Sequence, residues 1–178
     1  MKFTKTGLDH AFVVEIDPLE DERGLFARTF CAEEFRVRGL DFTISQCNVS
    51  YNRHRGTLRG LHYQVTPHAE VKLVRCTAGA VYDVIVDLRP TSATYTRWFA
   101  LELSAENRKM LYVPEGCAHG FLTLVSNAEV FYQMSKPYVP SAGRGIRWDD
   151  STIGIRWPMK PLVMSEDDRN HPVLSAIG

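Results

Sequence analysis

Hydrophobic residues alternate with polar ones in short runs along this chain, and glycine or proline interrupts the runs at close intervals. Because successive side chains of a strand point to opposite faces, this period of two predicts β-strands rather than helices. In the run at 80–88, apolar or aromatic residues take the even positions from 82 onward, while Asp83 and Asp87 share the odd positions with Ile85. Strands are predicted at residues 12–16, 57–64, 72–76, 80–88, 98–103, 110–113, 120–125 and 129–135.

Turn and helix signals are fewer than strand signals. Residues 77–79, Thr-Ala-Gly, predict a hairpin turn between the two strands that flank them. One short amphipathic helix is expected at 31–38, with Gly39 as its C-cap, and a single helical turn is expected at 165–169. Short strands separated by Gly and Pro are typical of an antiparallel sandwich or barrel.

The bulk composition limits the domain count and the classes of partner. A chain of 178 residues suits one domain with a sizeable core, so a single domain over 1–178 is predicted. Hydrophobic residues make up 44% and charged residues 24%, as in soluble globular proteins. Basic and acidic residues number 21 each, so no net positive field favours nucleic acid. No run approaches the roughly 18 apolar residues of a membrane span, so no membrane association is expected.

Four widely spaced cysteines bear on the cellular compartment. They stand at positions 31, 47, 76 and 117 and form no CxxC pair. The start of the chain also lacks the apolar segment of a signal peptide. Cysteines of proteins that stay inside the cell are usually free thiols. We therefore expect free cysteines and a cytoplasmic protein.

Three residues of the predicted strands suggest chemistry. The imidazole of His62 is of a type that titrates at about 6.5 and can take up a proton at neutral pH. Lys72, in an apolar run, can stabilise a developing oxyanion, and Tyr132 can act as an acid opposite a base. Each also has a plain structural explanation, as a hydrogen-bonded histidine, an edge-strand lysine or a packing tyrosine.

Residues 114–120, which include His119, resemble the second motif of cupin barrels. The first cupin motif supplies metal ligands as two histidines one residue apart, followed by a glutamate. Here Gln64 takes the place of one of these histidines, and glutamine is a poor metal ligand. We therefore expect no metal, although Glu70 or His68 offers a replacement ligand. Neither a GxGxxG nor a Walker pattern occurs, so a Rossmann or P-loop nucleotide site is not expected.

Taken together and in this order, the motifs resemble those of the nucleotide-sugar 3,5-epimerase family. The resemblance covers nearly the whole chain. Its motifs are residues 21–24, Gln46 with Asn48, 58–64, 72–76, 83–89, 104–107, 114–121, Tyr132, Tyr138, 148–150 and 165–168.

This resemblance implies a fold, an assembly and a substrate class. The fold would be all-β, a cupin-type jelly-roll sandwich with short peripheral helices, and the protein would form a homodimer. It would need no metal or other cofactor. Its substrate would be a nucleoside diphosphate 4-keto-6-deoxy sugar, whose keto group acidifies the protons on C3 and C5.

The resemblance also implies catalytic roles for four residues. His62 matches the family's base, and Asp168 matches the carboxylate that pairs with it. Lys72 would stabilise the enolate at C4. Tyr132 matches the acid that returns a proton from the opposite face, which inverts the carbon centre.

Binding roles carry over in the same way. Family positions around the diphosphate and the sugar are matched by Arg23, Gln46, Asn48, Arg59 and His119. Tyr138 matches an aromatic residue that stacks on the nucleobase, and Asp83 is assigned to the substrate-binding set.

Some positions depart from the family pattern near the nucleotide. Arg28 replaces a usual glutamate, Asp167 replaces a frequent lysine, and residues 141–145 lack a glutamate that some members use. The sequence therefore leaves open whether the nucleotide is thymidine diphosphate, cytidine diphosphate or another, and whether C3 alone or both centres react.

Two other functions also fit the sequence. A metal-dependent cupin enzyme, a dioxygenase or an isomerase, would use His62, Glu70 and His119 as ligands. A non-catalytic sugar-nucleotide binding module would hold its ligand with Arg23 and Arg59.

Overall fold

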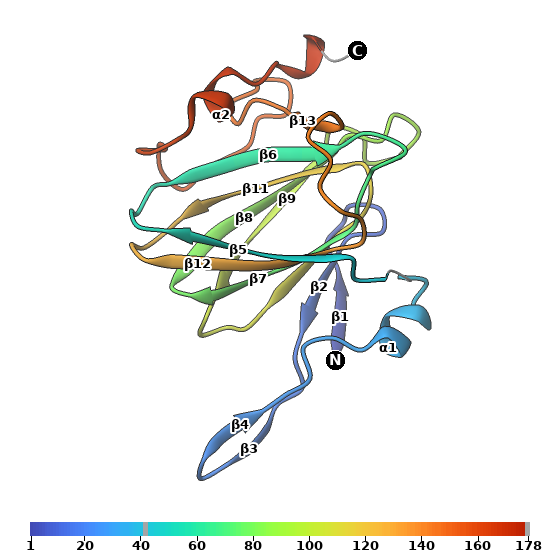
Figure 1. The fold of residues 1–178 in the computed structure, drawn as a ribbon, viewed down its shortest axis with the longest axis vertical. Coiled ribbons are helices and arrows are strands. Elements are labelled where there is room, and N and C mark those ends of the chain that lie inside the picture. The colour runs from blue at the N-terminus through green and yellow to red at the C-terminus, as the bar shows by residue number, and fades with distance from the viewer. Residues whose placement is uncertain (41–42, 177–178) are drawn as a thin grey trace.

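The chain folds into two antiparallel sheets that face each other. The computed structural model describes residues 1–40 and 43–176, so residues 41–42 and 177–178 of the predicted domain lie outside the described part. Figure 1 shows the two sheets side by side, with the C-terminal segment over one of them. This sandwich confirms the prediction of an all-β fold.

The first sheet has six strands in the order β1-β2-β10-β7-β12-β5, and the second has five in the order β13-β6-β11-β8-β9. The strands of the first sheet are β1 (Lys2–Lys5), β2 (Phe12–Glu15), β5 (Gln46–Asn52), β7 (Lys72–Ala78), β10 (Met110–Val113) and β12 (Ala128–Met134). Those of the second are β6 (Leu58–Gln64), β8 (Ala80–Asp87), β9 (Trp98–Ser104), β11 (Cys117–Thr123) and β13 (Gly143–Gly145).

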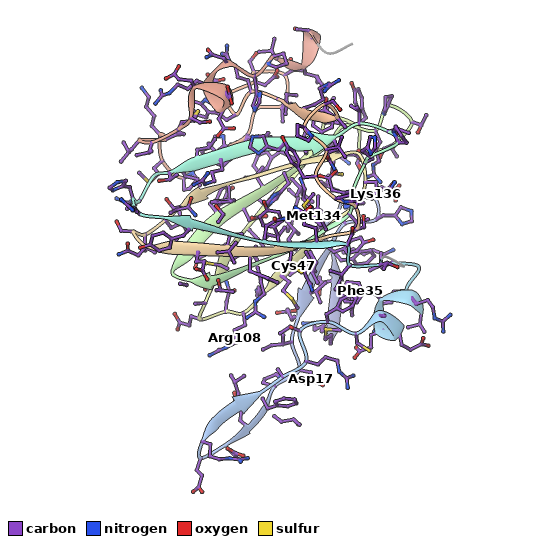
Figure 2. All side chains as sticks on the ribbon, viewed as in Figure 1. Asp17, Phe35, Cys47, Arg108, Met134 and Lys136 are labelled. Atoms are coloured by element: carbon purple, nitrogen blue, oxygen red, sulfur yellow. The ribbon has the colours of Figure 1, made fainter. Side chains whose placement is uncertain are left out.

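A separate hairpin, here called the arm, consists of β3 (Leu19–Asp21) and β4 (Gly24–Phe26). Figure 1 shows the arm projecting from the body of the molecule, and Figure 2 places Asp17 at its root. Its apolar side chains face solvent: Leu19 is 73% exposed and Phe26 is 74% exposed. Exposed large apolar side chains on a projecting element are typical of a contact surface.

The predicted hairpin at 77–79 is wrong. The strands on either side of it, β7 and β8, lie in different sheets, so the turn carries the chain across the sandwich. Gly79 has φ +69°, and this left-handed conformation, which glycine adopts freely, allows the tight reversal. Turn residues signal a change of direction but do not specify which strands pair.

The interior between the sheets explains the unusual parity of β8. Ile85 packs in the central cluster with Val74 and Phe121, so the odd positions of β8 face the interior. Val84 and Val86 belong to a second cluster on the outer face of the same sheet. Both faces of β8 are therefore covered, and the two acids on its odd positions point inward.

Short helices cover the outer faces of the sandwich. Helix α1 (Ala32–Arg36) packs Phe35, labelled in Figure 2, against the outer face of the first sheet. It is shorter than the predicted helix at 31–38, and its N-cap residue, Cys31, makes no side-chain capping bond.

The C-terminal segment carries α2 (Glu166–Asn170) and the 3₁₀-helix η1 (Leu174–Ala176) along the outer side of the second sheet. The predicted helical turn at 165–169 is confirmed, and Ser165 caps α2 by accepting a hydrogen bond from the Asp168 backbone N–H. In residues 1–40 and 43–176, no helix has the length and apolar character needed to span a membrane. The four cysteines are free thiols.

Candidate active site

A cleft of about 970 Å³ opens between the two sheets at the end where α2 lies. Strands of both sheets and the C-terminal segment contribute its walls. Its lining includes Gln46, Asn48, Arg59, His62, Gln64, Glu70, Lys72, His119, Tyr132, Tyr138, Arg144, Asp167, Asp168 and His171. This volume suits a small-molecule ligand of considerable size.

Strand β6 presents both Arg59 and His62 to this cleft, although strict alternation would put them on opposite faces. Its pairing with β11 shifts register, because His62 lies opposite His119 whereas Arg59 lies opposite Phe121. Three steps along β6 therefore match two along β11, which is the geometry of a β-bulge.

Glycine permits this bulge. Gly60 has φ +118°, and a Cβ placed on it would lie 2.6 Å from the Cα of Gly120. The two backbones approach too closely there for any larger residue. The bulge turns the side chain of Arg59 toward the same wall as His62.

His62 forms a hydrogen-bonded pair with Asp168. The Nε2 atom of His62 lies 2.6 Å from Oδ1 of Asp168. Burial acts to raise the pKa of Asp168, but the hydrogen bond and the charge of His62 outweigh it and hold this pKa below the usual carboxyl value. Because an ionised carboxylate only accepts hydrogen bonds, the proton of neutral His62 is assigned to Nε2, and Nδ1 keeps its lone pair.

The exposure of the pair suits proton transfer. The side chain of His62 is 49% exposed, whereas that of Asp168 is only 7% exposed. The buried carboxylate thus fixes the ring from behind, while the ring itself reaches the open cleft.

Lys72 projects from the opposite sheet into the same cleft. Its Nζ lies 2.9 Å from Oε1 of Glu70 and donates a hydrogen bond of 3.1 Å to the carbonyl of His62. The other oxygen of Glu70 accepts a bond of 3.1 Å from Gln64. The two charged side chains are only 8% and 3% exposed, so each depends on the other for neutralisation.

Tyr132 faces the cleft from β12, in the sheet that also holds Lys72. It pairs in register with Val74 and Asn48. Burial raises the pKa of Tyr132, so its phenol stays protonated at neutral pH. His62 and Tyr132 therefore stand on strands of opposite sheets.

His119 lies at the floor of the cleft. Its Nε2 is 2.9 Å from Oδ2 of Asp83 and 3.0 Å from Oδ1. Asp83 is 0% exposed and does not line the cleft, so the prediction that it binds substrate directly is corrected. Its carboxylate instead fixes the imidazole of His119 from behind.

Polar residues of β5 line the outer part of the cleft. The amide of Gln46 donates to Asn48 at 3.0 Å, and its oxygen accepts from the backbone N–H of Tyr138 at 3.0 Å. Tyr138 itself is exposed. Arg59 donates from Nε to Asn52 at 2.8 Å and also lines the cleft.

Arg23, a further predicted binding residue, lies well outside the cleft of its own chain. It lies at the turn of the arm, highly exposed, where its side chain contacts Asp21. The cleft lining contains no part of the arm.

The sequence interpretation missed His171. This residue follows α2 by one position, lines the cleft, and brings its Nε2 to 3.5 Å from Oδ1 of Asp168. Burial and the charge of His62 lower its pKa, so the ring is neutral at neutral pH. Its spacing of three residues after Asp168 was the available signal.

The residues that would bind the metal ion of a metal-dependent cupin enzyme make other contacts in this structure. Glu70 pairs with Lys72, and His119 pairs with Asp83. Within the described residues, the group of potential ligand atoms that lie within 4.8 Å of one another is formed by His62, Asp168 and His171.

Comparison with known proteins identifies the family of this chain. The family model described as dTDP-4-dehydrorhamnose 3,5-epimerase matches residues 5–176. The protein of that name from Sinorhizobium fredii is 46% identical over 155 residues, which are 86% of this chain and 80% of the relative.

Two solved structures extend the comparison to the fold. The dTDP-4-dehydrorhamnose 3,5-epimerase of Elizabethkingia anophelis superposes with a TM-score of 0.96 at 38% identity, covering 99% of this chain and 97% of its own. ChmJ, a 3'-monoepimerase from Streptomyces bikiniensis in complex with dTDP-quinovose, gives 0.87 at 35% identity, covering 95% and 86%. The expected cupin-type jelly roll is thereby confirmed. The match over nearly the whole chain shows that it belongs to the dTDP-4-dehydrorhamnose 3,5-epimerase family.

Proposed function

We propose that this chain epimerises a thymidine diphosphate 4-keto-6-deoxy sugar at C3 and C5, without a cofactor. The observation that carries the proposal is the 2.6 Å bond between His62 and Asp168 at the wall of a cleft that also holds Lys72 and Tyr132. A base, an enolate stabiliser and an acid are thus available to one bound ligand.

Proton abstraction falls to His62. Its Nδ1 takes the proton from the carbon next to the ketone, and the electron pair moves onto the C4 oxygen as an enolate. The imidazolium that forms is stabilised by the ionised Asp168 behind it. The ammonium of Lys72 stabilises the enolate oxygen, and its charge is already in place before the reaction.

Proton return falls to Tyr132. Because it stands on the sheet opposite His62, its phenol delivers a proton to the other face of the same carbon. Delivery from that face inverts the centre, whereas return from His62 would restore it. A repeat of the cycle at the second acidified carbon accounts for double epimerisation.

Replacing Tyr132 by phenylalanine is expected to slow epimerisation by about 10²-fold while hydrogen exchange with solvent continues. Abstraction by His62 survives in this variant, and only the opposite-face acid is lost. The measurement compares deuterium incorporation with inverted product in the same reaction. Equal losses of exchange and inversion would contradict the acid role of Tyr132.

The deciding experiment offers dTDP-linked and CDP-linked 4-keto-6-deoxyglucose in deuterated water, with label positions read by NMR. Label at C3 and C5 of the inverted dTDP product is expected. Label confined to C3 would instead assign a monoepimerase, as ChmJ is described. Preference for the CDP sugar would instead indicate that the nucleobase recognised is cytosine, with Arg144 and Asp167, which line the cleft, as the residues that contact it.

A non-catalytic binder would bind the sugar nucleotide without exchanging its hydrogens. A metal cupin would lose activity with a chelator. The proposed enzyme is expected to keep full activity in EDTA, because its base and acid are side chains. We also propose that the protein is located in the cytoplasm, as expected from the sequence.

The arm supports a homodimer. It presents Leu19 and Phe26 to solvent and carries Arg23 away from the cleft of its own chain. A second copy would cover these apolar side chains and receive Arg23 at its own cleft, where a guanidinium suits a diphosphate.

Complementation between two inactive variants tests this exchange. In a mixture of refolded Arg23→Ala and His62→Ala chains, a heterodimer has one complete site, because the His62→Ala chain supplies Arg23 to its partner. The mixture is therefore expected to exceed the activity of either variant alone by about tenfold or more, given the energy of charged hydrogen bonds. If Arg23 acted within its own chain, mixing would add nothing. Arg53→Ala, an exposed arginine outside the arm, serves as the control.

A further inference from the structure

His171 contacts the same carboxylate oxygen of Asp168 that pairs with His62. Its Nε2 is 3.5 Å from Oδ1 of Asp168, the oxygen that His62 approaches at 2.6 Å. The two imidazole rings are 5.4 Å apart at 87°, edge to face. One carboxylate oxygen is thus close to two histidine nitrogens, and the three atoms form a compact group.

The Nε2 atom of His171 is buried and has no hydrogen-bond partner among the described residues. The side chain as a whole is 19% exposed. A buried polar atom without a partner costs free energy and calls for an explanation, such as an ion or a water. The mechanism proposed above does not use this nitrogen.

We propose that His62, Asp168 and His171 form an inhibitory site for Zn²⁺. Two imidazole nitrogens and a carboxylate oxygen are a ligand set that zinc binds, with water in the fourth position. The half-exposed ring of His62 opens the site to the cleft, which provides both an entry path and room for that water.

The distances fit this ion after a small movement. Zinc bonds of about 2.0–2.1 Å in a tetrahedron place neighbouring ligand atoms about 3.3 Å apart. The contact between His171 and Asp168 is already 3.5 Å, and all three ligand atoms lie within 4.8 Å of one another. The pair at 2.6 Å must open by less than about 1 Å, and the two imidazole nitrogens must come to a similar separation; the half-exposed ring of His62 has the freedom for both movements.

Metal binding would disable the base through its tautomer. In the metal-free pair, Nε2 of His62 carries the proton and Nδ1 is free to accept one. A metal on Nε2 displaces that proton, so the neutral ring carries its hydrogen on Nδ1 and cannot accept another there. This inhibitory effect rests on the proposed function, whereas binding of the ion does not.

Zinc titration without substrate tests the site itself. The protein is freed of metal with EDTA, and Cys47→Ser removes the exposed thiol from every variant. A chromophoric indicator competing for Zn²⁺ is expected to show one ion per chain. His171→Ala is expected to weaken the affinity at least about tenfold, as loss of a metal-site residue does.

A second variant and a control complete the design. His171→Gln keeps most of the side-chain volume and decides the result if the alanine variant fails to fold. His54→Ala, which removes an exposed imidazole, is expected to bind zinc as the parent does. No saturable zinc binding by the parent, or equal affinity in the His171 variants, would overturn the site.

Exchange measurements then test inhibition. Zinc is expected to slow exchange at the concentrations that fill the site, with recovery in EDTA. Relative to its own metal-free rate, each His171 variant should need at least about tenfold more zinc. Zinc that fills the site without slowing exchange would overturn the inhibitory role. A chain that binds zinc but never exchanges would contradict the proposed function and leave the site standing.

Discussion

His62→Ala is expected to lower both epimerisation and solvent exchange by about 10²- to 10⁴-fold, because the variant loses the half-exposed imidazole that Asp168 holds at the wall of the cleft. Neighbouring groups are not placed to replace it: the Nε2 atom of His171, the other imidazole beside Asp168, is buried. Asp168 is buried behind the ring, and Lys72 is held by Glu70 on the other sheet. Initial rates of deuterium incorporation into the dTDP sugar measure the loss directly.

The fold should survive this change, since the ring is half exposed. Thermal unfolding of the variant therefore serves to separate chemistry from stability. His54→Ala, another exposed histidine on the same molecule, should keep the parent's rate. Retention of exchange by His62→Ala would remove this residue from the role of base.

Lys72→Met is expected to lower turnover by about 10²- to 10³-fold and also to destabilise the protein by about 3 kcal/mol. The first effect follows from the missing charge at the enolate oxygen. The second follows from Glu70, which stays buried without its partner. Denaturant unfolding and steady-state kinetics measure the two effects separately.

The double variant Lys72→Met with Glu70→Gln distinguishes the two causes. Replacing the carboxylate by a neutral amide removes the uncompensated charge, so stability should recover most of its loss. Activity should not recover, because the cation is still missing. Lys136→Met, which removes a more exposed lysine, controls for loss of positive charge. Recovery of turnover in the double variant would mean that Lys72 acts only through the fold.

The strand pattern was readable from the sequence where one face is apolar. The predicted strand at 110–113 agrees with β10, and the others differ by a few residues at their ends. Strand β5, Gln46–Asn52, was missed because its cleft-facing positions are polar. A strand that lines a binding site lacks the hydrophobic alternation by which strands are recognised.

Contacts between residues that are distant in the sequence could not be predicted as well as the strands. The bulge opposite Gly120 puts Arg59 and His62 on one wall, whereas counting positions separates them. Asp83 was noticed as an acid on an unusual face, but only the pairing of β8 with β11 reveals that it supports His119. Such contacts depend on which strands become neighbours, and local sequence does not determine that.

Since His62 belongs to one sheet and Tyr132 to the other, the separation of the two layers sets the distance between the proposed base and the proposed acid. Side chains that fill the middle of the sandwich but do not line the cleft, Ile85 among them, therefore also set this distance. Replacing one of these core side chains by a smaller one would shift the proposed proton donor, Tyr132, relative to C3 and C5 of the sugar by different amounts. Substitutions in the core could thus change the number of carbon centres that are inverted, without any substitution in the cleft.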